Sequence, residues 1–186
     1  MKKLFVIFAM IVFFFGMNTY EVFGQKTTFK VWKTIKLGTC KDVGLLHATL
    51  KAYQYEIAES AENLLSKSSF TLSLTEEEIQ LVNVSVADLG FSKDVNHGEI
   101  YAKAKELGLE LCPSEVGPQL RLQYKDQPKD EWLLIAMEPI VDSYGELGIF
   151  KIECYVEDYC MLGASPVDID DKLWSINTRF IFCLRK

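Results

Sequence analysis

The sequence predicts an α+β fold, in which two helices pack on a mainly antiparallel sheet with a C-terminal β-meander. Apolar residues recur every three or four positions between residues 43 and 66, which is the spacing of an amphipathic helix. A shorter helical pattern covers residues 97–107, and strand-like segments separated by polar turns follow it. Helices first and paired strands afterwards favour helices on one face of an antiparallel sheet.

The N-terminal half begins with an imperfectly alternating segment, residues 29–37, which predicts a first strand. After the 43–66 helix comes an ambiguous stretch. Thr75 and Glu78 have the spacing of a capping box, which favours a helix. Valines alternate with polar residues from 80 to 86, and alternation is typical of a strand. We expect the strand. Gly108 is expected to end the 97–107 helix.

The second half is expected to form the meander. Its first strand carries Leu120, Leu122 and Tyr124 on one face, so that Arg121 and Gln123 lie on the other face and are reachable. The apolar segment WLLIAME is the second strand, LGIFKIECYV is the third and TRFIFCLRK is the fourth.

The segment ELCPSEVGPQLRLQY, residues 110–124, joins the last helix to this sheet. It contains a thiol, two prolines, a carboxylate and an arginine. Residues before Pro113 prefer an extended backbone, and residues 114–118 have the composition of a turn. We therefore interpret it as a bend rather than a reactive site. Only Glu115 and Arg121 have no conformational role in this interpretation.

The first 24 residues predict an export signal. Two lysines precede a charge-free, mostly apolar run over residues 4–17, and Val22 and Gly24 stand before Gln25. This order matches a signal peptide cleaved after Gly24. The alternative is a retained membrane anchor, although the run is shorter than the roughly 20 apolar residues of a typical span. Residues 25–186 are expected to form a single exported domain, periplasmic or extracellular, with no membrane contact after cleavage.

The charge of this domain excludes some partners. Without residues 1–24 the chain keeps 18 basic and 25 acidic residues, a net charge of −7 over 162 residues. Binding to nucleic acid needs clustered lysine and arginine, and anionic lipid also attracts basic segments. We expect neither partner.

All five cysteines lie after residue 24, so they cannot all pair within one chain. Cys154 and Cys160 are the nearest pair. A straight strand would hold them about 20 Å apart, so a disulfide between them requires the chain to turn. Both a disulfide and two isolated buried thiols remain open.

Motifs for catalysis and for cofactors are weak, and we predict no catalytic residue, metal ligand or cofactor. His47 is expected to pack beside the apolar stripe, and His97 to lie in a surface turn. The acidic run at residues 168–171 departs from the EF-hand pattern and is interpreted as a solvated loop. Aromatic residues gather in the C-terminal half, where they either fill the sheet core or form an exposed strip for glycans or a partner protein.

Several segments of the chain, most specifically residues 99–140, resemble segments of a group of uncharacterised bacterial proteins. The resemblance rests on VWKTIKLGT, on EIYAKAKELGLELCPSEVGPQLRLQYKDQP and on EWLLIAMEPI, and extends over most of the chain after residue 24. No activity, ligand or catalytic residue is established for that group, so the resemblance implies no function. Its members often lack an export signal.

Three functions remain open. The first is a non-enzymatic binding domain for a protein or envelope ligand, with Glu115, Arg121 and Trp132 as contact residues, because arginine anchors carboxylates and tryptophan anchors interfaces. The second is a cell-envelope hydrolase that uses carboxylates or Cys112. The third is a structural envelope protein.

Overall fold

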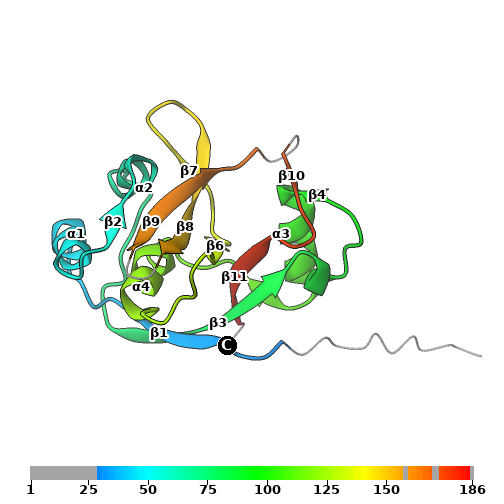
Figure 1. The fold of residues 1–186 in the computed structure, drawn as a ribbon, viewed down its shortest axis with the longest axis horizontal. Helices are drawn as coiled ribbons and strands as arrows, with labels where there is room; N and C mark the ends of the chain where they lie inside the picture. The colour runs from blue at the N-terminus through cyan, green and yellow to red at the C-terminus, as the bar shows by residue number, and fades with distance from the viewer. Residues whose placement is uncertain (1–28, 157–158, 169–171, 185–186) are drawn as a thin grey trace, which may run out of the picture.

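The computed structural model describes residues 29–156, 159–168 and 172–184. Within these residues a curled, mixed sheet of nine strands forms the centre, in the order β1-β3-β11-β6-β8-β9-β2, with β5 paired to β11 and β7 to β8 (Figure 1). The strands of this sheet are β1 (Lys33–Leu37), β2 (Glu56–Ile57), β3 (Glu77–Ser85), β5 (Leu109–Glu110), β6 (Trp132–Ile135), β7 (Ile140–Val141), β8 (Leu147–Val156), β9 (Tyr159–Pro166) and β11 (Arg179–Leu184). A separate pair, β4 (Val95–Asn96) and β10 (Leu173–Trp174), lies beside it.

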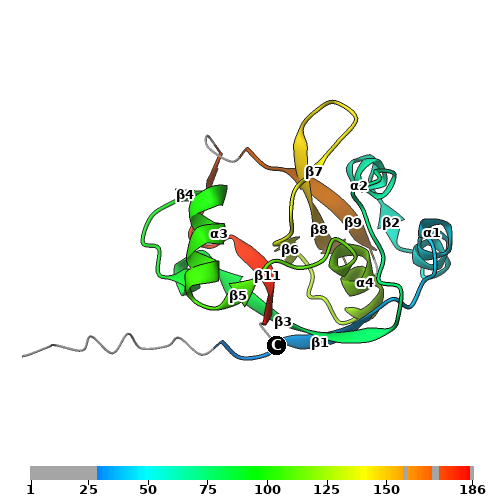
Figure 2. The same ribbon diagram turned by 180° about the vertical axis from the view of Figure 1, so that it is seen from behind.

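Four α-helices and one short 3-10 helix, η1 (Ala87–Leu89), accompany the strands in the described part of the chain. They are α1 (Val43–Ala52), α2 (Glu59–Leu65), α3 (His97–Glu106) and α4 (Val116–Gln123). Helix α3 lies on the β11 side of the molecule, whereas α1, α2 and α4 gather near β8, β9 and β2 (Figure 2). Aromatic rings join α3 to the sheet, since Tyr101 contacts Phe182 edge to face.

The predicted fold class is wrong in three respects. The helices number four rather than two, and the sheet is mixed because β11 pairs with β6 in parallel and β2 pairs with β9 in parallel. The C-terminal strands form no simple meander, because the last strand inserts between β3 and β6. Local patterns predict single strands, but they do not specify which strands become neighbours.

The first predicted helix is divided. Helix α1 ends at Ala52, Gln54 adopts a positive φ of 61°, and β2 pairs with β9 before α2 begins at Glu59. The apolar stripe continues through both helices, so periodicity alone predicted one. No glycine or proline marks the break. The strand predicted at 80–86 is confirmed as β3, and the capping box lies instead at Asn96 and Glu99 of α3.

The predicted strand through Leu120, Leu122 and Tyr124 is wrong, because residues 116–123 form α4. Hydrogen bonds between side chains four residues apart accompany this helix: Gln119 Nε2 donates to Glu115 Oε1 (3.0 Å), and Gln123 Nε2 donates to Gln119 Oε1 (3.1 Å). Pro118 is tolerated because it lies in the first turn, where backbone N–H groups lack helical partners.

Helix α4 packs closely on the sheet. A Cβ added at Gly117 would lie 2.6 Å from Phe150 Cβ, so glycine permits the helix to approach β8. Every residue from Val116 to Leu122 is buried. The extended backbone predicted before Pro113 is confirmed by β5 and the bridge at Cys112. The turn predicted at residues 114–118 covers only Ser114 and Glu115, because α4 begins at Val116.

Candidate functional site

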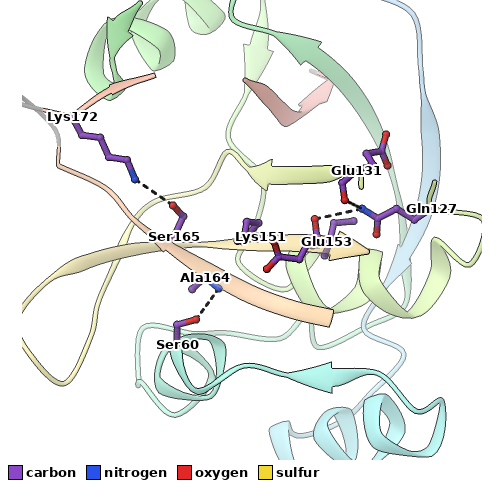
Figure 3. Close-up of polar contacts among 9 residues, drawn as sticks. Ser60, Gln127, Glu131, Lys151, Glu153, Ala164, Ser165 and Lys172 are labelled. Atoms are coloured by element: carbon purple, nitrogen blue, oxygen red, sulfur yellow. Dashed lines mark hydrogen bonds and ion pairs between the residues drawn. The ribbon is translucent and has the colours of Figure 1, made fainter. Parts of the chain in front are cut away.

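The face of β6, β8 and β9 opposite α4 carries the polar and aromatic groups that are available to a ligand. Strand β8 alternates along its length, since Phe150 and Ile152 are fully buried in the core. Lys151 and Glu153 lie on the other face of the strand (Figure 3). Register pairs Lys151 with Gly163 of β9, and Glu153 with Trp132 of β6. This face therefore draws residues from three strands.

The centre of the face is an ion pair. Lys151 Nζ lies 2.8 Å from Glu153 Oε2, and both side chains are largely shielded from solvent. Gly163 lies beneath them, and a Cβ added there would come within 3.3 Å of Glu153 Oε1. The glycine thus leaves the space in which Glu153 rests against the sheet.

Glu153 also lies near an aromatic ring. Interaction with Glu153 raises the pKa of the Tyr155 hydroxyl, so the phenol lies near the same carboxylate that pairs with Lys151. The Tyr159 ring lies 6.1 Å from the Tyr155 ring, centroid to centroid, and its hydroxyl donates to Glu56 of β2. This hydrogen bond raises the pKa of Tyr159.

Trp132, Tyr155 and Tyr159 together form what we call the aromatic strip. Their exposed fractions are 43%, 48% and 45%. The strip crosses β6, β8 and β9, and the carboxylate of Glu56 holds the Tyr159 ring by its hydroxyl group. Asp130, whose side chain is 73% exposed, lies two residues before Trp132.

A cationic group lies at the other end of the face. Lys172 Nζ donates to the Pro166 carbonyl oxygen at 2.9 Å and lies 3.5 Å from Ser165 Oγ (Figure 3). The ammonium also sits 4.2 Å from the centroid of the Trp174 ring. Desolvation, together with the positive charge of Lys151, lowers the pKa of Lys172.

Trp174 belongs to an aromatic cluster under α3 that includes His97. His97 is only 2% exposed, and neither of its ring nitrogens has a hydrogen-bond partner among the described residues. Desolvation, and then the charge of Lys172, lowers the pKa of His97 to about 4. The prediction that His97 lies in a surface turn is therefore wrong. His47 is half-buried, as expected, and its Nε2 lies 2.5 Å from Glu62 Oε1.

Two of the three predicted contact residues lie in the interior. Glu115 is fully buried, and its carboxylate accepts hydrogen bonds from the backbone N–H of Gly38 (2.8 Å) and of Ser73 (2.7 Å). It ties two chain segments to α4. This is the conformational role that the sequence did not reveal.

Arg121 is also fully buried, so the expectation that it is reachable on a strand face is wrong. Its guanidinium donates to the Tyr124 carbonyl oxygen (2.6 Å) and to Gln127 Oε1, and lies 4.5 Å from the Tyr55 ring. Desolvation lowers its pKa. Only Trp132, among the three predicted contacts, lies at the surface.

The disulfide that the sequence left open is present. Cys154 and Cys160 are register partners in the antiparallel β8–β9 pair and are bonded to each other. The bond ties β8 to β9 immediately beside Tyr155 and Tyr159, and so restricts the backbone that carries the aromatic strip.

The sequence analysis identified the aromatic residues of the C-terminal half as either sheet core or an exposed strip, but it did not single out Lys151 or Glu153. The signal was the alternation along LGIFKIECYV, whose odd-numbered residues from 149 onward share one face. The described residues contain no cluster of three or more metal-ligating side chains. They also include no helix that is long and apolar enough to span a membrane. The predicted signal segment and residues 169–171 of the acidic run lie outside the described residues.

No family model, curated protein or solved structure matches this chain.

Proposed function

We propose that the protein is an exported binding domain, and that it recognises a basic segment of a partner protein through the aromatic strip. The observation that carries this proposal is the convergence of Trp132, Tyr155 and Tyr159 on one sheet face, each more than 40% exposed. Tyrosine and tryptophan are enriched at protein interfaces because they offer large, rigid contact areas with a polar end.

The charge around the strip supports a basic partner. Glu56 lies against Tyr159, the exposed Asp130 lies two residues before Trp132, and the chain without residues 1–24 carries a net charge of −7. Lysine and arginine side chains gain from carboxylates and from the faces of aromatic rings. A negatively charged surface also accelerates the encounter with a basic partner at low salt.

Rigidity of the strip supports the same proposal. The hydroxyl group of Tyr159 is hydrogen-bonded to Glu56, and the Cys154–Cys160 bond fixes the strands beneath Tyr155 and Tyr159. Side chains that are held in place lose less conformational entropy on binding.

Peptide binding tests the proposal. Two fluorescein-labelled peptides of equal length, one rich in lysine and arginine and one rich in glutamate, are titrated with residues 25–186 and followed by anisotropy. We expect the basic peptide to bind more tightly, and its affinity to fall as salt rises. Trp132→Ala should weaken binding about tenfold, or about 1.4 kcal/mol, because it removes an interface anchor.

The matched control is Tyr144→Ala. Tyr144 is 79% exposed but lies in the turn between β7 and β8, outside the strip. The Tyr144→Ala substitution should leave the affinity for the basic peptide unchanged. The proposal would be wrong if Trp132→Ala and Tyr144→Ala lowered the affinity for the basic peptide equally. It would also be wrong if the protein showed no preference for the basic peptide over the acidic one.

A further inference from the structure

A second pair of cysteines lies in the interior, on the far side of the sheet from the aromatic strip. Cys183 Sγ lies 3.0 Å from Cys112 Sγ. Cys112 is 4% exposed and Cys183 is 3% exposed. The two residues are 71 positions apart in the chain, so only the tertiary fold brings them together.

Strand pairing explains why they meet. Cys183 of β11 is the register partner of Glu110 of β5, and Cys112 follows Glu110 by two residues. The Cys112 N–H donates to the Ala136 carbonyl oxygen at 2.6 Å, and its thiol donates to the Ile181 carbonyl oxygen at 3.4 Å. Backbone contacts on both sides therefore hold Cys112 against β11.

The geometry points to a second disulfide: we infer that Cys112 and Cys183 become bonded to each other when the chain folds in the presence of a disulfide oxidant. A protein disulfide has an S–S length of about 2.05 Å, so the two sulfur atoms need to approach by about 1 Å.

The reaction is thiol–disulfide exchange with a small-molecule disulfide such as oxidised glutathione. The thiolate of one cysteine attacks the oxidant, forms a mixed disulfide and releases one glutathione thiolate. The thiolate of the other cysteine then displaces the second glutathione. Two protein thiols are oxidised to one disulfide, one glutathione disulfide is reduced to two glutathione thiols, and the two protons pass to these products.

Burial determines when this reaction takes place. Desolvation raises the pKa of the Cys112 thiol well above its ordinary value, and the thiolate is the reactive form. The packed interior also excludes the oxidant. The bond therefore forms during folding, before the sheet closes over the pair, and the folded protein resists both oxidation of the dithiol and reduction of the bond.

The inference accounts for the odd cysteine count. Cys154–Cys160 and Cys112–Cys183 use four of the five cysteines, and Cys40 remains as a buried single thiol. The second bond closes a much longer loop than the first, so it restricts the unfolded chain more strongly.

Counting thiols tests the inference, independently of any binding function. Residues 25–186 are reduced and unfolded, then refolded with reduced and oxidised glutathione. The product is alkylated with iodoacetamide in denaturant and weighed by intact mass spectrometry. We expect one alkylated cysteine per chain, at Cys40, and a cross-linked proteolytic peptide pair that contains Cys112 and Cys183.

The Cys154–Cys160 bond is the internal control for oxidising conditions. If that bond forms while Cys40, Cys112 and Cys183 are all alkylated, the inference is wrong. The variant Cys112→Ala should show two alkylated cysteines, at Cys40 and Cys183. If this variant does not fold, the peptide map of the unmodified sequence still decides between the dithiol and the disulfide.

Discussion

Acidification should destabilise this protein through His97. The ring is 2% exposed and has no hydrogen-bond partner among the described residues, so protonation places a charge in an apolar setting beside Lys172. The pKa of His97 is about 4 in the folded protein, against an ordinary value of about 6.5 in the unfolded chain. The unfolded state therefore binds the proton more tightly, and stability is lost as pH falls from about 6.5 towards 4.

The size of the loss follows from the two pKa values. Each unit of difference corresponds to about 1.36 kcal/mol. At pH 5 the unfolded histidine is almost fully protonated and the folded one is mostly neutral, which gives a loss of about 2 kcal/mol relative to pH 7.5. Below pH 4 the loss reaches its full value of about 3 kcal/mol.

Urea unfolding, followed by circular dichroism at pH 7.5 and pH 5.0, measures this loss. Carboxylates also begin to titrate in this range, so the control is His97→Leu, which keeps a similar volume and cannot be protonated. We expect the unmodified protein to lose about 2 kcal/mol more than the variant between the two pH values. Equal losses in both proteins would show that His97 titrates normally, and the argument from burial would fail.

The remaining predictions concern α4. Glu115→Ala should lower the free energy of unfolding by about 2–4 kcal/mol, because the buried N–H groups of Gly38 and Ser73 lose their acceptor. Urea unfolding measures this free energy. A loss below about 0.5 kcal/mol would show that water replaces the carboxylate. Gly117→Ala should cost about 1–3 kcal/mol by forcing α4 away from Phe150. The comparison variant is Gly90→Ala, whose added methyl group meets no neighbouring atom, although the φ of 98° at this position adds backbone strain. Thermal unfolding compares the two variants. A smaller loss of stability for Gly117→Ala than for Gly90→Ala would contradict the predicted packing.

The sequence correctly predicted several single elements. The helix at 97–107 and the strands at LGIFKIECYV and TRFIFCLRK correspond to α3, β8 and β11. It failed at residues 116–123, because a fully buried helix has no polar face to reveal its period. Leucines at 120 and 122 then imitate the alternation of a strand.

The candidate site was predictable only in part. Trp132 was selected as an interface residue by its type, and its side chain is 43% exposed. Glu115 and Arg121 were selected because no conformational role was visible for them, but such roles depend on partners distant in sequence: Glu115 binds the backbone of Gly38, 77 residues away. Residue type could indicate the chemistry of these side chains but not their burial.

The sequence by itself determined the acidic charge, the odd number of cysteines and the alternation that separates the two faces of β8, since these follow from composition and from the two-residue period of a strand. Tertiary structure alone decided that β11 lies between β3 and β6, that Cys112 meets Cys183, and that three aromatic rings converge at one end of the sheet. Strand pairing is set by the combined burial of the whole sheet, and no short segment carries that information.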